Sequence, residues 1–314
     1  MIKIRIAETL DFNKEVINFL RSFADVTIEP CTQKDIPAIL SEYDVFWFRL
    51  GFHIGKEQLK NSVRCKILAT PVTGIDHIDE KLCREKGIRI ACLRGERDFL
   101  INVRATAELT LALTLDLLRR TGPATKDALD GNWRRDLFRG SEIFGKRVGI
   151  IGYGRLGAIT ASYFESFGAQ IFYTDTRKVL SNDNHKRLES IEELILACDI
   201  ISIHVNLNDE NINLLSKKRI SLFDNSKYLI NTSRGGLVDE EALLEQLKYG
   251  KMAGAAIDVV KDELNWSFSN PLGKYARNNS NLIITPHIGG NTYESFEKTE
   301  WFIAKKIKEH ILHA

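Results

Sequence analysis

Arg234, Glu263 and His287 stand in this order in the last third of the chain, each close beyond an expected β-strand. Arginine offers a planar, permanently charged fork that binds a carboxylate. Histidine exchanges a proton near neutral pH, and a neighbouring carboxylate orients its ring. Because ligands of doubly wound sheets bind outside the carboxyl ends of the strands, all three side chains can face one cleft. The set is suited to acid–base chemistry on a substrate that carries a carboxylate.

Each of the three residues also has a structural explanation. Arg234 stands beside two glycines and could cap a strand–helix turn, whereas Glu263 could be a solvated acid of a loop. His287 follows Pro286 and could be a histidine whose hydrogen bonds serve the fold alone. The occurrence of all three, in this order on strand ends, favours the chemical interpretation.

A glycine-rich loop precedes these residues. It follows the apolar run 147–151 and begins a stretch with a helical pattern, and Asp175 stands at the end of the next expected strand. The loop residues are Gly152, Tyr153, Gly154, Arg155, Leu156 and Gly157. A strand, a glycine loop, a helix, a strand and an acid within about 30 residues indicate a dinucleotide-binding βαβ unit. The positive end of the helix would bind the phosphates.

The acid indicates which dinucleotide binds. Asp175 stands where a carboxylate accepts hydrogen bonds from the adenosine ribose hydroxyls and repels a 2′-phosphate, which favours NAD over NADP. Arg177, two residues further on, is of the type that accepts such a phosphate, and its alternative is a solvated loop residue. Since Asp175 is retained, we expect NAD.

The first hundred residues alternate short apolar runs with helical patterns, which is typical of a parallel sheet covered by helices. Strands are expected at residues 3–7, 24–28, 44–48, 66–69 and 88–91. Helices are expected at residues 13–23, 34–41, 56–62 and 78–86. The pattern predicts a doubly wound unit without a phosphate-binding loop.

A helical pattern over residues 102–120 leads to a second series, which contains the glycine loop. Strands are expected at residues 148–151, 171–174, 200–204, 228–231, 253–258 and 282–285. Helices are expected at residues 155–166, 191–197, 217–222 and 240–249, and a final helix at 293–312 could return to the first unit. We therefore expect an α/β protein with two doubly wound parallel-sheet domains. They are a flavodoxin-like substrate domain (1–100 plus 291–314) and a Rossmann NAD-binding domain (101–290), with the substrate in the cleft between them.

Bulk composition excludes several classes of protein. The 314 residues allow two domains, and 44% hydrophobic with 27% charged residues is typical of globular chains. The net charge of +2 predicts no nucleic acid or membrane partner. Five cysteines form no CxxC pair and no metal-ligand spacing, so we expect no metal and a reducing compartment. Without a signal-peptide pattern at its start, the protein is expected to be cytoplasmic.

The sequence resembles the D-isomer-specific 2-hydroxyacid dehydrogenase family over nearly its whole length. The likeness extends from the segment around Arg49 through residues 73–77 and 102–120 to the glycine loop. It continues through residues 231–241, 254–263 and 285–290, where the ending Pro-His-Ile-Gly-Gly is specific.

The resemblance implies a role for each catalytic candidate. Arg234 would hold the substrate carboxylate and polarise the C2 oxygen, and His287 would exchange a proton with that oxygen while Glu263 pairs with its second ring nitrogen. Implied NAD contacts are the six loop residues, Asp175, His204, Thr232, Asp258, which would contact the nicotinamide carboxamide, and Gly289. Implied substrate contacts are Arg49, Thr73, Gly74 and Arg234.

The chain departs from the family pattern at a few positions. Leu264 replaces the usual proline after Glu263, and Asn206 and Asn211 replace a proline and a threonine beyond His204. These departures put loop geometry in doubt rather than the reaction. Because the chain ends soon after its last helix, we expect no C-terminal regulatory domain.

Substrate and assembly remain open in the sequence. Arg49 would suit D-3-phosphoglycerate and 3-phosphohydroxypyruvate, or it could be a strand-end charge in solvent; glyoxylate and hydroxypyruvate reduction are alternatives. A non-catalytic NAD-sensing corepressor is a further alternative. The family implies a homodimer, with residues 102–120 and 138–144 as the expected contact.

Overall fold

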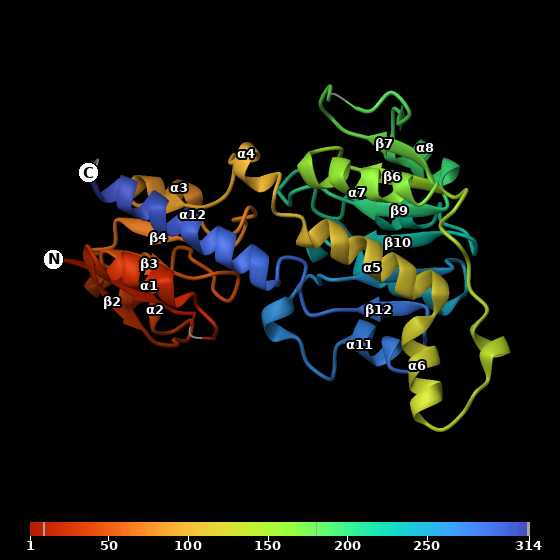
Figure 1. Ribbon diagram of the computed structural model, residues 1–314, viewed down its shortest axis with the longest axis horizontal. Helices are drawn as coiled ribbons and strands as arrows, with labels where there is room; N and C mark the ends of the chain where they lie inside the picture. The colour runs from red at the N-terminus through yellow and green to blue at the C-terminus, as the bar shows by residue number, and fades with distance from the viewer. Residues whose placement is uncertain (9, 180, 313–314) are drawn as a thin grey trace. The chain divides into compact units, whose positions relative to one another are not determined.

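The computed structural model describes residues 1–8, 10–179 and 181–312. The chain divides into two units (Figure 1). Unit 1 comprises Met1–Val103 and Thr292–Ala314, and unit 2 comprises Arg104–Asn291. Each unit is built on one parallel sheet with helices on both faces, so the expected α/β fold class is confirmed.

Unit 1 contains a five-stranded sheet in the order β2-β1-β3-β4-β5, with all neighbours parallel. Its strands are β1 (Ile2–Ile6), β2 (Ala24–Ile28), β3 (Val45–Trp47), β4 (Ile67–Ala69) and β5 (Arg89–Ala91). This is the flavodoxin-like order, in which the chain reverses its winding direction between β1 and β3. Ligands of such sheets bind at that switch point.

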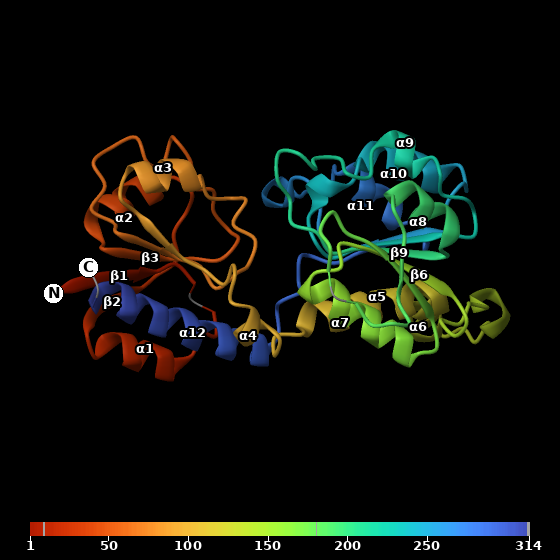
Figure 2. The same ribbon diagram turned by 90° about the horizontal axis from the view of Figure 1, so that it is seen from above.

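Helices cover both faces of the unit 1 sheet, as Figure 2 shows. On one face lie α1 (Lys14–Arg21) and α12 (Tyr293–Leu312), and on the other lie α2 (Ile36–Glu42) and α3 (Glu80–Glu85). The short α4 (Arg97–Leu100) follows β5. Asn13 caps α1 by accepting hydrogen bonds from the backbone N–H groups of Glu15 and Val16. Val16 and Leu20, four residues apart, bury the apolar side of α1.

Unit 2 contains a seven-stranded parallel sheet in the order β12-β11-β10-β9-β6-β7-β8. Its strands are β6 (Arg147–Ile151), β7 (Gln170–Thr174), β8 (Lys186–Arg187), β9 (Ile200–Ile203), β10 (Tyr228–Asn231), β11 (Gly254–Ile257) and β12 (Leu282–Ile284). The order from β8 to β11 is the Rossmann order, with its switch point between β6 and β9.

The helices of unit 2 also form two layers (Figure 2). On one face lie α5 (Ala105–Arg119), α6 (Thr121–Leu129) and α7 (Arg155–Ser166). On the other lie α8 (Ile191–Ala197), α9 (Lys217–Ile220), α10 (Glu240–Lys248) and α11 (Pro271–Ala276). The strand Ile200–Ile203, in which all four residues are buried and only Ser202 is polar, is typical of a sheet covered on both faces.

Some elements differ from expectation. The helix expected at residues 56–62 is wrong: the segment forms turns, because Leu59 is its one buried apolar residue and a helix needs a stripe of them. The helix α5 begins at Ala105 rather than at residue 102, and it ends at Arg119, before Arg120, which adopts φ 54°. The helices α6 and α11 and the two-residue β8 were not expected. Among the described residues, no helix is long and apolar enough to cross a membrane.

Candidate active site

Three neighbouring strands bring the loops of the catalytic candidates to one edge of the unit 2 sheet. Arg234 follows β10, Glu263 follows β11 and His287 follows β12. These strands pair in register, so that Ile257 of β11 lies between Asn231 of β10 and Ile284 of β12. The carboxyl ends of the strands therefore meet at the same level, and the three loops leave the sheet together.

His287 and Glu263 form a direct pair. The Nδ1 atom of His287 lies 2.6 Å from Oε2 of Glu263, and both side chains are partly exposed, at 20% and 32%. Glu263 opens a short 3₁₀ turn, Glu263–Asn265, so the departure at Leu264 leaves the pairing intact. A carboxylate on Nδ1 makes that nitrogen the donor and leaves Nε2 to exchange a proton with a substrate.

The backbone at His287 is also unusual. It adopts φ 53°, in the left-handed region that most side chains avoid. Its N–H donates to the carbonyl oxygen of Asp258 at 2.8 Å, which fixes the loop against the end of β11. Strained backbone of this kind persists where the surrounding structure holds it, and it is frequent at functional sites.

Asp258 organises the histidine loop. Its carboxylate, 1% exposed, accepts from the hydroxyl of Thr285 at 2.6 Å and from the backbone N–H groups of Ile288 and Gly289 at 2.9 and 2.7 Å. Burial raises the pKa of Asp258, and these hydrogen bonds counteract part of the rise. A carboxylate offers about four acceptor sites, so one remains for the predicted contact with a nicotinamide amide.

The loop that carries Arg234 is held by its neighbours. The side-chain amide of Asn231 donates to the carbonyl of Arg234 at 2.9 Å, and the hydroxyl of Ser233 donates to the carbonyl of Ile203 at 2.7 Å. A Cβ at Gly235 would lie 2.0 Å from the backbone of Val260, so only glycine fits there. The guanidinium of Arg234 is thus presented from a fixed backbone.

Thr232, a predicted cofactor contact, is buried and its hydroxyl lies 2.8 Å from that of Thr110 in α5. The sequence reasoning missed Thr110. Thr110 precedes Thr232 by 122 residues, and no local pattern marks it as a partner of the site.

The glycine loop fits the close approach of a phosphate. Gly152 adopts φ 88°, and a Cβ there would lie 2.6 Å from the carbonyl oxygen of His204. A Cβ at Gly157 would lie 2.1 Å from the carbonyl oxygen of Gly152, so helix and turn require glycine to pack. A Cβ at Gly154 would meet no atom closer than 3.6 Å, the nearest being on the side chain of Arg177. Space is left where backbone N–H groups of the α7 terminus would meet a pyrophosphate.

Asp175 lies at the end of β7, beside this loop. Its carboxylate accepts from the backbone N–H of Tyr153 at 2.9 Å and from the backbone and side chain of Arg177 at 2.8 and 3.1 Å. Burial alone would raise the pKa of Asp175, but the hydrogen bonds from Arg177 and Tyr153 outweigh it and the pKa is lowered. Asp175 is therefore an anion near neutral pH, as contact with ribose hydroxyls requires.

His204, after β9, contacts the same loop through its backbone. Burial lowers the pKa of its imidazole to about 4, so the ring is neutral at pH 7. Its Nε2 lies 2.8 Å from the hydroxyl of Ser202. Its Nδ1 is buried and has no hydrogen-bond partner in the described part of the chain. A buried polar atom of this kind beside a glycine loop is consistent with a bound cofactor.

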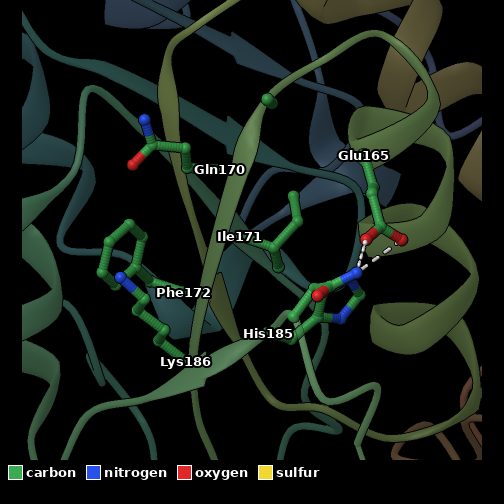
Figure 3. Close-up of a pocket in the computed structure, with 8 residues that line it drawn as sticks. Glu165, Gln170, Ile171, Phe172, His185 and Lys186 are labelled. Carbon is green, nitrogen blue, oxygen red and sulfur yellow. Dashed lines mark hydrogen bonds and ion pairs between the residues drawn. The ribbon is translucent and has the colours of Figure 1, made fainter.

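Tyr153 connects the glycine loop to a pocket beside β7 and β8, the last two strands in the order of the unit 2 sheet. Its hydroxyl is hydrogen-bonded to Nδ1 of His185, whose Nε2 lies 3.2 Å from Oε2 of Glu165 (Figure 3). The pocket measures about 300 Å³ and is lined by Glu165, Ala169, Gln170, Ile171, Phe172, Asn184, His185 and Lys186. None of the predicted site residues lines it, so it is separate from the candidate active site.

In unit 1 the predicted substrate residues follow neighbouring strands. Arg49 follows β3, and Thr73 and Gly74 follow β4, so both segments lie beyond carboxyl ends of the sheet. Arg49 is paired with Glu8 and Glu300 rather than extending into solvent. No cluster of metal-ligating side chains occurs among the residues that the structure describes.

Comparison with known proteins agrees with this geometry. Over 313 residues the chain is 29% identical to D-3-phosphoglycerate dehydrogenase of Methanocaldococcus jannaschii, covering 98% of this chain and 57% of that protein. It is 33% identical over 263 residues to glyoxylate reductase of Thermococcus litoralis, covering 81% of this chain and 76% of the relative. The chain thus spans little more than half the length of the first of these relatives.

Solved structures and a family model extend the comparison. D-Lactate dehydrogenase from Aquifex aeolicus, solved with NAD and lactic acid, superposes with a TM-score of 0.87 at 26% identity, covering 99% of this chain and 96% of that one. Residues 111–289 match the model described as D-isomer specific 2-hydroxyacid dehydrogenase, NAD binding domain. The chain therefore belongs to the D-isomer specific 2-hydroxyacid dehydrogenase family, and residues 111–289 correspond to the NAD binding domain of that family.

Proposed function

We propose that this protein is an NAD-dependent dehydrogenase that interconverts a D-2-hydroxy acid and the corresponding 2-oxo acid. The observation that carries the proposal is the 2.6 Å pair of His287 and Glu263. It lies beside the Arg234 loop, on the same sheet as a glycine loop that fits a dinucleotide. An NAD-sensing corepressor can retain the same three residues, so measured turnover distinguishes the two functions.

Each residue of the proposed site has one task. Arg234 holds the substrate carboxylate and withdraws electrons from the C2 oxygen through its fixed positive charge. His287 donates a proton from Nε2 to that oxygen during reduction and removes it during oxidation. Glu263 keeps the imidazole in the tautomer that presents Nε2 and stabilises the ring when it is charged. The bound cofactor would provide the redox partner for C2: the reduced form, NADH, would supply the hydride for reduction, and the oxidised form, NAD⁺, would accept it during oxidation.

The proposed function is tested by the rate at which the protein oxidises NADH with a panel of 2-oxo acids. The panel comprises glyoxylate, pyruvate, hydroxypyruvate and 3-phosphohydroxypyruvate, each repeated with NADPH. We expect turnover with at least one acid, and a higher kcat/KM with NADH because the Asp175 carboxylate repels a 2′-phosphate. Tight NADH binding without turnover of any acid would contradict the dehydrogenase and favour an NAD-sensing role.

We further infer a homodimer formed through residues 129–144 of unit 2. Most of the apolar side chains of α5 that were expected at the contact pack inside unit 2 instead, with Leu113 and Leu117 buried. The segment that follows exposes large apolar side chains to solvent, namely Leu129, Trp133, Leu137 and Phe144. Exposed apolar sets of this kind mark contact surfaces.

The dimer is tested by light scattering at micromolar concentration. We expect twice the mass of the chain, and a Trp133→Asp variant should approach the mass of a single chain because a charge is placed in the contact. A single-chain mass for the unmodified protein would refute the dimer.

A further inference from the structure

Arg49 of unit 1 lies at the point of the fold where a ligand is expected. Glu8 follows β1 and Arg49 follows β3, and β1 and β3 are the two strands between which the sheet reverses its winding. Open α/β sheets bind ligands in the crevice outside this switch point. The charges that meet there therefore affect which substrates the unit accepts.

Two carboxylates hold the Arg49 side chain. Its Nε donates to Oε2 of Glu8 at 2.6 Å, and its Nη2 donates to Oε1 of Glu300 in α12 at 3.1 Å. The guanidinium also lies 3.7 Å from the centre of the Phe296 ring, so it is held in position by an aromatic face. Only 17% of the Arg49 side chain is exposed.

Glu300 is fixed more firmly than a surface acid. It is 2% exposed, and its second oxygen accepts from the backbone N–H of Asn13 at 3.0 Å. Burial raises the pKa of Glu8 and of Glu300, and the charge of Arg49 opposes this rise in both. If Arg49 turned toward a substrate, Glu300 would become a buried charge without a cation, which is strongly unfavourable.

A phosphate would meet little positive charge in this crevice. One guanidinium faces two carboxylates, and a doubly charged phosphate placed against Glu8 would be repelled. Arg94 of unit 1, another candidate for a phosphate contact in the sequence, is also paired, since it contacts Glu80 at 2.8 Å. The arrangement suits a substrate whose end distal to C2 carries no phosphate.

We propose that Glu8 and Glu300 are specificity-determining residues: by retaining Arg49 they make the protein act on unphosphorylated 2-oxo acids in preference to phosphorylated ones. The proposal rests on the dehydrogenase function above and names its substrate class. It reverses the sequence expectation that Arg49 would bind a substrate phosphate.

The test compares kcat/KM for hydroxypyruvate and 3-phosphohydroxypyruvate, two acids that differ by the phosphate. The unmodified protein should favour hydroxypyruvate by about tenfold or more, since like-charge contacts strongly suppress wrong partners. In Glu8→Gln and in Glu8→Gln/Glu300→Gln the ratio should move toward the phosphorylated acid by about tenfold or more, because glutamine keeps the shape and removes the charge.

Glu57→Gln is the matched control, because Glu57 is an exposed acid of unit 1 paired with Lys60 at 3.2 Å. It changes the net charge equally and should leave the ratio unchanged. Preference of the unmodified protein for 3-phosphohydroxypyruvate would overturn the proposal, as would an unchanged ratio in a folded Glu8→Gln variant. If the double variant does not fold, the ratios of the unmodified protein and of Glu8→Gln still test the proposal. No turnover of any acid would instead refute the dehydrogenase function.

Discussion

Replacing His287 by alanine should lower kcat by about 10²- to 10⁴-fold, the usual contribution of a positioned general acid–base. The reason is that Nε2 is the atom proposed to exchange the proton, whereas the loop around it is held by Asp258 through bonds that do not involve the imidazole. NADH affinity should therefore remain close to that of the unmodified protein. Steady-state turnover and NADH fluorescence titration measure the two quantities separately.

The backbone at residue 287 requires its own control. Alanine is strained at φ 53°, whereas asparagine tolerates left-handed backbone and cannot act as the acid. His287→Asn should lose turnover as alanine does and keep NADH affinity at least as well. If both variants lost turnover and NADH binding in equal proportion, His287 would be structural. His53→Ala, at an exposed histidine of unit 1, should change neither quantity.

Replacing Arg234 by glutamine should lower kcat/KM for the 2-oxo acid by about 10²- to 10³-fold, the scale for losing one electrostatic donor to developing charge. Glutamine removes the cation that is proposed to hold the carboxylate and stabilise the C2 oxygen. The backbone of the loop should persist, because Asn231 binds the carbonyl of residue 234 and not its side chain. NADH affinity and thermal unfolding temperature provide the check on folding.

Two matched variants make the Arg234 result specific. Arg234→Lys retains the charge without the planar fork, so it should recover only part of the loss. Arg119→Gln removes an exposed arginine at the end of α5 and should have no effect on kcat/KM. Full activity in Arg234→Gln would remove this residue from substrate binding and would require another cation for the carboxylate.

The strands could be predicted because apolar runs in a parallel sheet are buried on both faces. The run at Ile200–Ile203 is an example, since each of its residues is buried. The helix predicted at residues 56–62 does not form, because Leu59 is the one buried apolar residue there and no others follow at helical spacing. The two-residue β8 could not be predicted, because two exposed basic residues carry no strand signal and only pairing with β7 defines it.

The candidate site could be predicted where its chemistry lies in consecutive residues. The glycine loop and the loop around His287 are of this kind, and parallel topology explains why both leave the sheet at the carboxyl ends of its strands. Contacts between distant segments are different. The pairing of Arg49 with Glu300 joins residues far apart in the chain, and a sequence gives no sign that a cation expected at a phosphate is already neutralised. Packing of α12 against the sheet creates that contact.

If the glycine loop binds NAD as proposed, the hydrogen bond between Tyr153 and His185 links the β8 end of the unit 2 sheet to the bound cofactor. Tyr153 belongs to the glycine loop, whereas His185 immediately precedes β8, the terminal strand of the sheet. A short strand at the end of a sheet would ordinarily be expected to accept substitutions with little effect on a distant site. Here, substitutions around residues 184–187 would be transmitted to the phosphate loop, so natural or engineered variation at this border should be judged by its effect on dinucleotide affinity as well as on folding.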